Sequence, residues 1–246
     1  MTNMTTKSTT TKISKITKIT RALGSVTEVE VAAADPEPDC RICPRLAAFR
    51  DDWREREPAW HNAPVATFGP AHAKLLIVGL APGLRGANRT GRPFTGDFAG
   101  DLLYGTLIKF GFARGSFEAR PDDSLELIDT AITNAVRCVP PQNKPTANEI
   151  VQCRPFLEAT IRQMPNLKAM LALGRIAHDS VVRTLGLKLK DAPFGHGAMH
   201  ETGAGLRLYN SYHCSRYNTN TGVLTPAMFS AVFVALRAHV DGVRRG

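Results

Sequence analysis

The pattern of apolar and polar positions changes its period several times between residue 74 and the C-terminus. Short, nearly continuous apolar runs predict buried strands, whereas apolar residues three and four positions apart predict helices. The predicted strands are residues 74–80, 129–137, 168–173 and 206–212, and the predicted helices are residues 96–110, 147–163, 175–185 and 226–240. Because strands and helices alternate, we expect an α/β fold with a parallel sheet covered by helices on both faces.

Two of the predicted helices carry recognisable start signals. Thr146 and Glu149 have the spacing of a capping box, in which each side chain bonds to the backbone of the other residue. Thr225 is a good N-cap, and Pro226 follows it at the first helical position, where its missing N–H group costs nothing. These signals place the starts of the second and fourth predicted helices.

The N-terminal segment has a different composition from the rest of the chain. Residues 1–35 are rich in Thr, Lys and Ser and contain few large apolar side chains. A disordered or weakly ordered tail is the prediction, although the Lys-Ile repeat at residues 12–20 also fits a weak amphipathic segment. The chain length of 246 residues suits one large domain, which we place at residues 36–246.

The positive charge of the chain lies outside this tail. The net charge is +9, while the lysines and arginines of residues 1–39 are balanced by Asp and Glu. A basic globular domain suits a polyanion such as DNA, but many soluble proteins are basic for other reasons, so charge alone leaves nucleic-acid binding open. Every apolar run is shorter than a membrane span and no secretory signal is evident, so we expect a cytoplasmic protein without a membrane association.

Three long loops should meet at one edge of the sheet. Residues 80–97, 138–146 and 213–224 each follow a predicted strand, and ligands of such folds bind beyond the carboxyl ends of the strands. The first loop is rich in glycine and ends with an aromatic ring, Phe94, and its only carboxylate, Asp97. Taken singly, Phe94 could be a core residue and Asp97 a helix N-cap.

The cysteines indicate a metal site more than a disulfide framework. Cys40 and Cys43 form a Cys-x-x-Cys pair, whereas Cys138 and Cys153 are widely spaced, unlike the second short pair of a zinc ribbon. Four thiolates suit an iron–sulfur cubane and also tetrahedral zinc, and spacing alone does not decide between them. Nearby arginines could contact DNA phosphates or offset the thiolate charge: Arg41, Arg45, Arg137 and Arg154.

Three stretches of the chain resemble one known family. Residues 79–97, 132–146 and 211–222 are similar to the motifs of the uracil-DNA glycosylase superfamily, in the same order, and the similarity extends from about Cys40 to the last helix. Leu80, where family 4 has Glu, resembles family 5, the UdgB type. The resemblance implies a three-layer α/β/α fold with a central four-stranded parallel sheet. It also implies a 4Fe–4S cluster on Cys40, Cys43, Cys138 and Cys153.

The resemblance also implies roles for individual residues. The expected catalytic residues are Asp97, which stabilises the developing sugar cation and orients water, His213, which donates a hydrogen bond to the departing base, and Asn143. The expected base-binding residues are Phe94, which stacks on the base, Leu80, Ala81, Gly83 and Asn134. The segment after His213, residues 214–218 with Arg216, is expected to enter the DNA. Apart from the resemblance, four loop cations are candidates for phosphate contact and could equally be solvated charges: Lys144, Arg85, Arg89 and Arg92.

The implied activity is hydrolysis of the N-glycosidic bond of uracil in DNA and of other deaminated bases such as hypoxanthine, without a lyase step, by a monomer. The alternatives are a non-catalytic iron–sulfur protein that binds DNA and senses damage or redox state, and a zinc-stabilised nucleotide hydrolase. Two further residues have no assigned role. Cys214 replaces the Pro that often follows the histidine in relatives, and we expect it to be inert, while His196 lies in a loop that could approach the site.

Overall fold

A central sheet contains all four predicted strands, in the parallel arrangement that the sequence pattern indicates. The computed structural model describes residues 34–242, so the predicted tail lies outside the described residues except for its last two positions. The strand order is β4-β1-β5-β7-β6, and the pairs β4–β1, β1–β5 and β5–β7 are parallel. The four parallel strands are β1 (Leu75–Gly79), β4 (Thr130–Asn134), β5 (Ala169–Leu173) and β7 (Leu206–Ser211).

The prediction of a four-stranded sheet is corrected by a fifth strand. β6 (Met199–Gly203) pairs antiparallel with β7 at the edge of the sheet. Ala204 and Gly205 connect the two strands, and both have positive φ, as a tight hairpin turn requires. The exposed and half-buried residues of β6 alternate, so it lacks the continuous apolar run by which the other strands were recognised.

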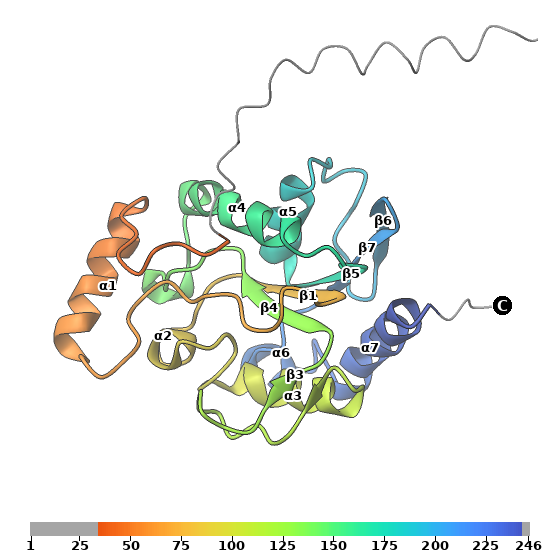
Figure 1. Ribbon diagram of the computed structural model, residues 1–246, viewed down its shortest axis with the longest axis horizontal. Helices are drawn as coiled ribbons and strands as arrows, with labels where there is room; N and C mark the ends of the chain where they lie inside the picture. Colours follow the sequence, from red (N-terminus) through yellow and green to blue (C-terminus); the bar gives the residue numbers. More distant parts are fainter. Residues whose placement is uncertain (1–33, 243–246) are drawn as a thin grey trace, which may run out of the picture. The chain divides into compact units, whose positions relative to one another are not determined.

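Helices cover both faces of the sheet, which confirms the three-layer α/β/α architecture (Figure 1). One face carries α4 (Ala147–Arg162) and α5 (Arg175–Thr184), and the other carries α3 (Phe98–Lys109) and α7 (Pro226–Val240). The predicted capping box of α4 and the Thr225 N-cap of α7 are both present. Among the described residues, none of the helices has the length and apolar character needed to cross a membrane.

Alternate residues of the strands supply two separate cores. Leu75, Ile77 and Ile132 pack with α3 and α7, whereas Leu76 and Val78 pack with α4 and α5. All five residues of β1 are buried, and β1 lies inside the sheet between β4 and β5. Burial on both faces explains why the strands read as continuous apolar runs. The strands therefore form a rigid base whose carboxyl ends share one edge.

The remaining elements lie in segments that the sequence pattern assigned to loops or left open. They are α1 (Pro44–Arg56), α2 (Ala87–Thr90), β2 (Ala113–Arg114), β3 (Glu126–Leu127), the 3-10 helix η1 (Pro141–Asn143) and α6 (Arg216–Asn220). α2, η1 and α6 are single turns inside the three long loops. Asp35, at the end of the predicted tail, accepts hydrogen bonds from Thr67 and pairs with Arg137 at 3.1 Å, so the packed structure includes this residue.

Candidate active site

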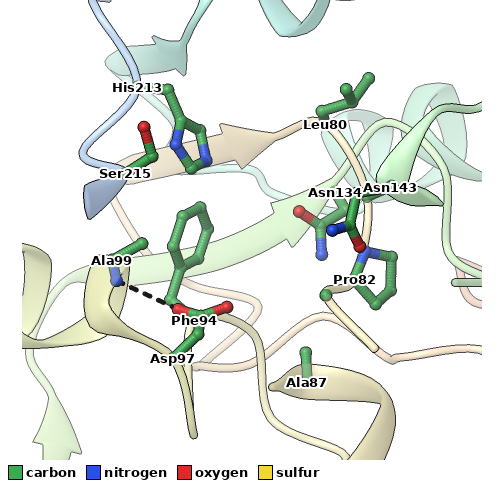
Figure 2. A pocket seen from close by; sticks show the side chains of 12 residues that line it. Leu80, Pro82, Ala87, Phe94, Asp97, Ala99, Asn134, Asn143, His213 and Ser215 are labelled. Carbon is green, nitrogen blue, oxygen red and sulfur yellow. Dashed lines mark hydrogen bonds between the residues drawn. The ribbon is translucent and has the colours of Figure 1, made fainter. Parts of the chain in front are cut away.

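The three long loops converge on one cavity at the carboxyl edge of the sheet. The cavity measures about 330 Å³, and Figure 2 shows its side chains. The lining residues are Leu80, Ala81, Pro82, Gly83, Ala87, Phe94, Asp97, Ala99, Asn134, Asn143, His213 and Ser215. The structure thus brings together all eight residues that the sequence predicts for catalysis and base binding. The cavity has a suitable size for one small planar molecule.

Phe94 forms one wall of this cavity. Its ring lies 5.9 Å from the imidazole of His213, centroid to centroid, and the two rings are stacked with an interplanar angle of 29° (Figure 2). The backbone of Phe94 has a φ of 53°, a conformation that costs free energy for a non-glycine residue and that the surroundings must enforce. Gly79 leaves space for this ring, because a Cβ atom there would lie 2.8 Å from it and 2.4 Å from the Asn134 amide oxygen.

A buried ion pair holds the segment on both sides of Phe94. Arg92 donates two hydrogen bonds of 2.7 Å to Asp123 and one of 2.8 Å to Thr95 Oγ1. The Tyr104 hydroxyl donates to the Pro93 carbonyl oxygen at 2.6 Å. Arg92 is only 5% exposed, so its predicted contact with DNA phosphate is wrong. Its guanidinium instead stabilises the loop around Phe94 through its bonds to Asp123 and Thr95.

Asp97 is both an N-cap and a cavity residue. Its Oδ1 accepts a 3.2 Å hydrogen bond from the Ala99 N–H group at the start of α3. Its Oδ2 faces Gly86, where a Cβ atom would come within 2.6 Å of it, so the glycine makes room for the carboxylate. The residue keeps an exposed surface, yet the protein atoms around the carboxyl group raise its pKa by desolvation, and hydrogen bonds from the helix N-terminus oppose this rise.

His213 lies two residues beyond the end of β7 and faces Phe94. Its carbonyl oxygen accepts a 2.8 Å hydrogen bond from the Asn218 side chain in α6. Burial lowers the pKa of the imidazole, which favours the neutral ring at neutral pH. Within residues 34–242 the ring nitrogens make no hydrogen bond, so the donor of the neutral ring is available to a molecule in the cavity.

Two amide side chains lie opposite the two rings (Figure 2). Asn134, the last residue of β4, is 3% exposed, and its amide has no hydrogen-bond partner in the described part of the chain. Its amide lines the cavity, where a bound molecule can form hydrogen bonds with it. Asn143 is exposed on η1 with a φ of 57°. The donors and acceptors needed to read the edge of a planar base are therefore present beside a stacking face.

The cations predicted to bind DNA lie outside the cavity. Arg216, Lys144 and Arg89 are all exposed and make no ion pair with other described residues. The Arg216 guanidinium covers the Phe98 ring at 5.2 Å. Its neighbour Tyr217, in the segment that the sequence predicts to enter the DNA, is 74% exposed and is a large aromatic side chain facing solvent. The sequence places Tyr217 in this segment, but only the structure shows how far its side chain is exposed.

Cys214 lies behind this site and not in it. Its side chain is fully buried in the core that contains α3 and α7, and burial raises the pKa of the thiol to about 12. A thiol with this pKa is protonated at neutral pH and is a poor nucleophile. These findings agree with the expectation of an inert residue.

The other four cysteines line a second, smaller cavity. Cys40, Cys43, Cys138 and Cys153 come from the segment before α1, the start of α1, the loop after β4, and α4. Desolvation, reinforced by mutual repulsion, raises the pKa of Cys43 to about 11 and that of Cys138 to about 12. No group of three or more His, Cys, Asp or Glu side chains within residues 34–242 is arranged to hold a metal ion.

A buried arginine adjoins these cysteines. Arg50, on α1, is 1% exposed, and its Nη1 donates to the Cys40 carbonyl oxygen at 3.0 Å and lies 4.0 Å from Cys138 Sγ. Its Nε and Nη2 have no hydrogen-bond partner within residues 34–242, and the Asp51 carboxylate lies 3.9 Å from Nε, so its charge is only partly compensated. A buried cation needs nearby negative charge, which thiolates held by a metal cluster would provide. The chemistry of the four thiols and of the buried Arg50 therefore suits a thiolate-bound metal group, although the four described side chains do not lie in a metal-binding arrangement.

The four arginines that the sequence placed around the cysteines have different roles. Arg137 is fully buried and bonds to Asp35 and to the threonine hydroxyls of Thr67 and Thr160, so it faces neither DNA nor solvent. Arg45 donates two hydrogen bonds to the Glu149 carboxylate, one to each oxygen. Arg41 pairs with Asp51, and Arg154 is half-buried, with no partner for its Nε in the described residues. The sequence could not reveal Arg50, because its position relative to Cys138 depends on the tertiary structure.

Known proteins share both the motifs and the length of this domain. The sequence pattern described as the Uracil DNA glycosylase superfamily matches residues 66–237. The chain belongs to this superfamily. It is 44% identical to the type-5 uracil-DNA glycosylase of Thermus thermophilus, over 79% of this chain and 91% of that protein. Identity to the type-5 uracil-DNA glycosylase of Mycobacterium leprae is 42%, with 79% and 88% covered, and to that of Pyrobaculum aerophilum 38%, with 76% and 83% covered.

The matched relatives confirm the assignment to type 5. A type-4 uracil-DNA glycosylase of Pyrobaculum aerophilum is 32% identical over only 56% of this chain. The superfamily match spans the cavity residues from Leu80 to His213, so the site lies within the shared region.

Proposed function

We propose that the protein is a DNA repair glycosylase that hydrolyses the N-glycosidic bond of uracil in DNA and leaves an abasic site. One observation carries this proposal: the Phe94 ring, the Asp97 carboxyl group and the His213 imidazole enclose a single cavity. Its membership of the uracil-DNA glycosylase superfamily agrees with this chemistry. A base inside a duplex cannot reach such a cavity, so the target nucleotide must leave the stack.

Base recognition would combine stacking with edge hydrogen bonds. The flipped base stacks on Phe94, which the Arg92–Asp123 pair holds in its left-handed conformation. Asn134 presents a buried amide donor and acceptor to the base edge. Because this amide lacks partners among the described residues, a matching base edge satisfies it, whereas a mismatched edge leaves it desolvated and unpaired.

Cleavage of the glycosidic bond leaves positive charge on the sugar and negative charge on the base, which Asp97 and His213 stabilise respectively. The sugar develops oxocarbenium character, which the anionic Asp97 stabilises while it orients the attacking water. The departing base becomes anionic, and neutral His213 donates a hydrogen bond to its O2 atom. Water adds to C1′ of the sugar and releases a proton to solvent. The C1′–N bond breaks, its electron pair leaves with the base, and the base anion then takes up a proton from solvent. The Asp97 carboxylate must be anionic for this role, and its pKa is raised. As the pH falls, the excision rate should therefore begin to drop at a higher pH than for an ordinary aspartate.

The loop after His213 would enter the DNA. Tyr217 is the exposed aromatic residue that fills the space left by the flipped nucleotide. Arg216, Lys144 and Arg89 contact the backbone phosphates around it. Every residue proposed for this step belongs to one chain, so a monomer would suffice for it.

Four cysteines would hold a 4Fe–4S cluster: Cys40, Cys43, Cys138 and Cys153. When bound, the cluster supplies structural cross-linking and no redox step. Iron and sulfide analysis with optical spectroscopy tests this assignment. We expect thiolate-to-iron absorption, loss of iron in Cys153→Ser and retention of iron in the control Cys214→Ser. Stoichiometric zinc in place of iron would contradict it.

The central experiment uses an oligonucleotide with one uracil, followed by alkali to cut at abasic sites. We expect the protein to produce a cut at the uracil position. Asp97→Asn should lower the excision rate by roughly 10²–10⁴-fold while DNA binding persists. Asp101→Asn is the matched control, because Asp101 is an exposed acid one turn further along α3. Full activity of Asp97→Asn would refute the mechanism, and binding without excision by the unaltered protein would favour a damage-sensing role.

Substrate breadth is a second prediction. Leu80 is an apolar, half-buried residue of the cavity wall, so it imposes no hydrogen-bond requirement on the base. We expect release of hypoxanthine as well as uracil from otherwise identical oligonucleotides. Leu80→Glu should lower hypoxanthine release more than uracil release. Strict selectivity of the unaltered protein for uracil would count against this interpretation.

A further inference from the structure

The chain that carries His213 leaves the sheet before it reaches the site. β7 ends at Ser211, and side chains satisfy the backbone groups that follow. The Tyr212 N–H group donates to His196 Nδ1 at 3.2 Å, and the Tyr212 carbonyl oxygen accepts from Ser211 Oγ at 2.8 Å. The His213 carbonyl oxygen accepts from Asn218. The orientation of His213 therefore depends on a few side-chain contacts.

His196 is the member of this set that comes from a distant segment. It lies in the turn before β6, and Gly197 anchors that turn by donating to the Asn210 carbonyl oxygen at 2.9 Å. The His196 imidazole stacks on the Tyr212 ring, with the centroids 5.1 Å apart and an interplanar angle of 25°. His196 is not among the residues that line the cavity. His196 Nδ1 also lies 3.4 Å from Ser211 Oγ, so its contacts reach His213 through the backbone of Ser211 and Tyr212.

The hydrogen bond defines the protonation state of His196. Because Nδ1 accepts from a backbone N–H group, it must be unprotonated, and the ring proton lies on Nε2. Desolvation lowers the pKa of His196, which favours the same neutral form, and no charged group contributes to that shift. A protonated Nδ1 would place two N–H groups against each other. The contact thus requires an acceptor at this position and not merely a ring of this size.

We propose that His196 is a positioning residue, whose neutral Nδ1 fixes the Tyr212 backbone and so holds the His213 imidazole over Phe94. This inference rests on the proposed glycosylase function. An error of about 1 Å in the position of a catalytic group can lower a rate roughly 10²-fold. Loss of the acceptor should therefore reduce excision while base and DNA binding are retained.

The variants separate the acceptor from the shape of the side chain. His196→Leu keeps an apolar side chain without an acceptor, whereas His196→Asn places an amide oxygen near the position of Nδ1. His72→Leu is the control, because His72 is an exposed histidine before β1, at the opposite end of the strands. We expect a single-turnover excision rate at least about tenfold lower in His196→Leu and substantial recovery in His196→Asn. DNA affinity and thermal stability should change little. If His196→Leu does not fold, His196→Gln replaces it, because its amide lies one methylene further out.

Two further measurements make the test independent of general stability. In a His213→Ala background, His196→Leu should cause no additional loss of rate, since both residues act through one group. The ring resonances of His213 in the DNA-free protein should shift in His196→Leu and remain in place in His196→Asn and His72→Leu. Unchanged resonances and an unchanged excision rate in His196→Leu would overturn the inference. An unaltered protein that excises no base would refute the proposed function instead, and the resonances would still test the positioning.

Discussion

At the scale of single residues, the cavity depends on positions where a side chain is absent. A Cβ atom at Gly86 would come within 2.6 Å of Asp97 Oδ2, closer than real Cβ contacts allow. The carboxylate must move to admit a Cβ atom at this position. We predict that Gly86→Ala displaces Asp97 and lowers the excision rate by roughly 10²-fold, and thermal unfolding measured on the same variant separates this displacement from a loss of stability.

The matched control for Gly86→Ala is Gly105→Ala. Gly105 lies on an exposed face of α3, and a Cβ atom there would meet nothing within 4 Å. Alanine in a helix interior is more stable than glycine by about 0.8–1.0 kcal/mol, so Gly105→Ala should be fully active and slightly more stable. Equal excision rates for the two variants would show that the position of the Asp97 carboxylate is not critical.

At the scale of elements, a hairpin outside the site stabilises the loop inside it. Asp123 lies between β2 and β3, accepts from the N–H groups of Glu118 and Leu125, and binds the Arg92 guanidinium with both oxygens. The hydrogen bond from Arg92 is the main reason that the pKa of Asp123 falls to about 2. We predict that Asp123→Asn, which leaves the Arg92 charge buried without a counterion, costs about 3–5 kcal/mol of stability.

The stabilisation by Asp123 should depend on pH. Because the pKa of Asp123 is lower in the folded protein than its ordinary value of 3.8, its contribution is complete above pH 4 and is lost as the pH falls toward 2. Urea unfolding at pH 7 and at pH 3 measures the free energy of unfolding of both proteins. The unaltered protein should exceed Asp123→Asn in this free energy by more at pH 7 than at pH 3. An equal difference at the two pH values would mean that the Asp123 charge does not cause the loss of stability.

The elements also show what the sequence could predict. The four parallel strands and their helices were predictable, because burial on both faces makes the strands continuous apolar runs and because Thr146 and Thr225 mark helix starts. β6 was missed because its exposed edge position leaves no such run, and α2 and α6 because a single turn has no periodicity. The cavity residues were predictable only through family motifs. Asp123 and His196, which hold those motifs in place, act across long sequence separations that no local pattern records.

At the scale of the whole molecule, the charge of the folded domain should determine how it meets DNA. The net charge is +9, and three exposed cations of the loops around the cavity, Arg216, Lys144 and Arg89, have no ion-pair partner among the described residues. Each phosphate contact releases condensed counterions, so the logarithm of the binding constant falls with the logarithm of salt concentration by about 0.9 per contact. We predict that Arg216→Gln reduces this slope by about one and weakens binding equally for uracil and thymine oligonucleotides.

The control for Arg216→Gln is Arg162→Gln. Arg162 lies at the far end of α4 from the cavity, and Glu158 already neutralises it with an ion pair of 2.9 Å. Because a phosphate contact requires a free cation near the bound strand, Arg162→Gln should leave the salt slope unchanged. Titrations carried out in the Asp97→Asn background prevent excision during the measurement. If Arg162→Gln and Arg216→Gln reduced the slope equally, binding would depend on total charge, and the DNA would not be confined to the edge of the sheet where the cavity opens.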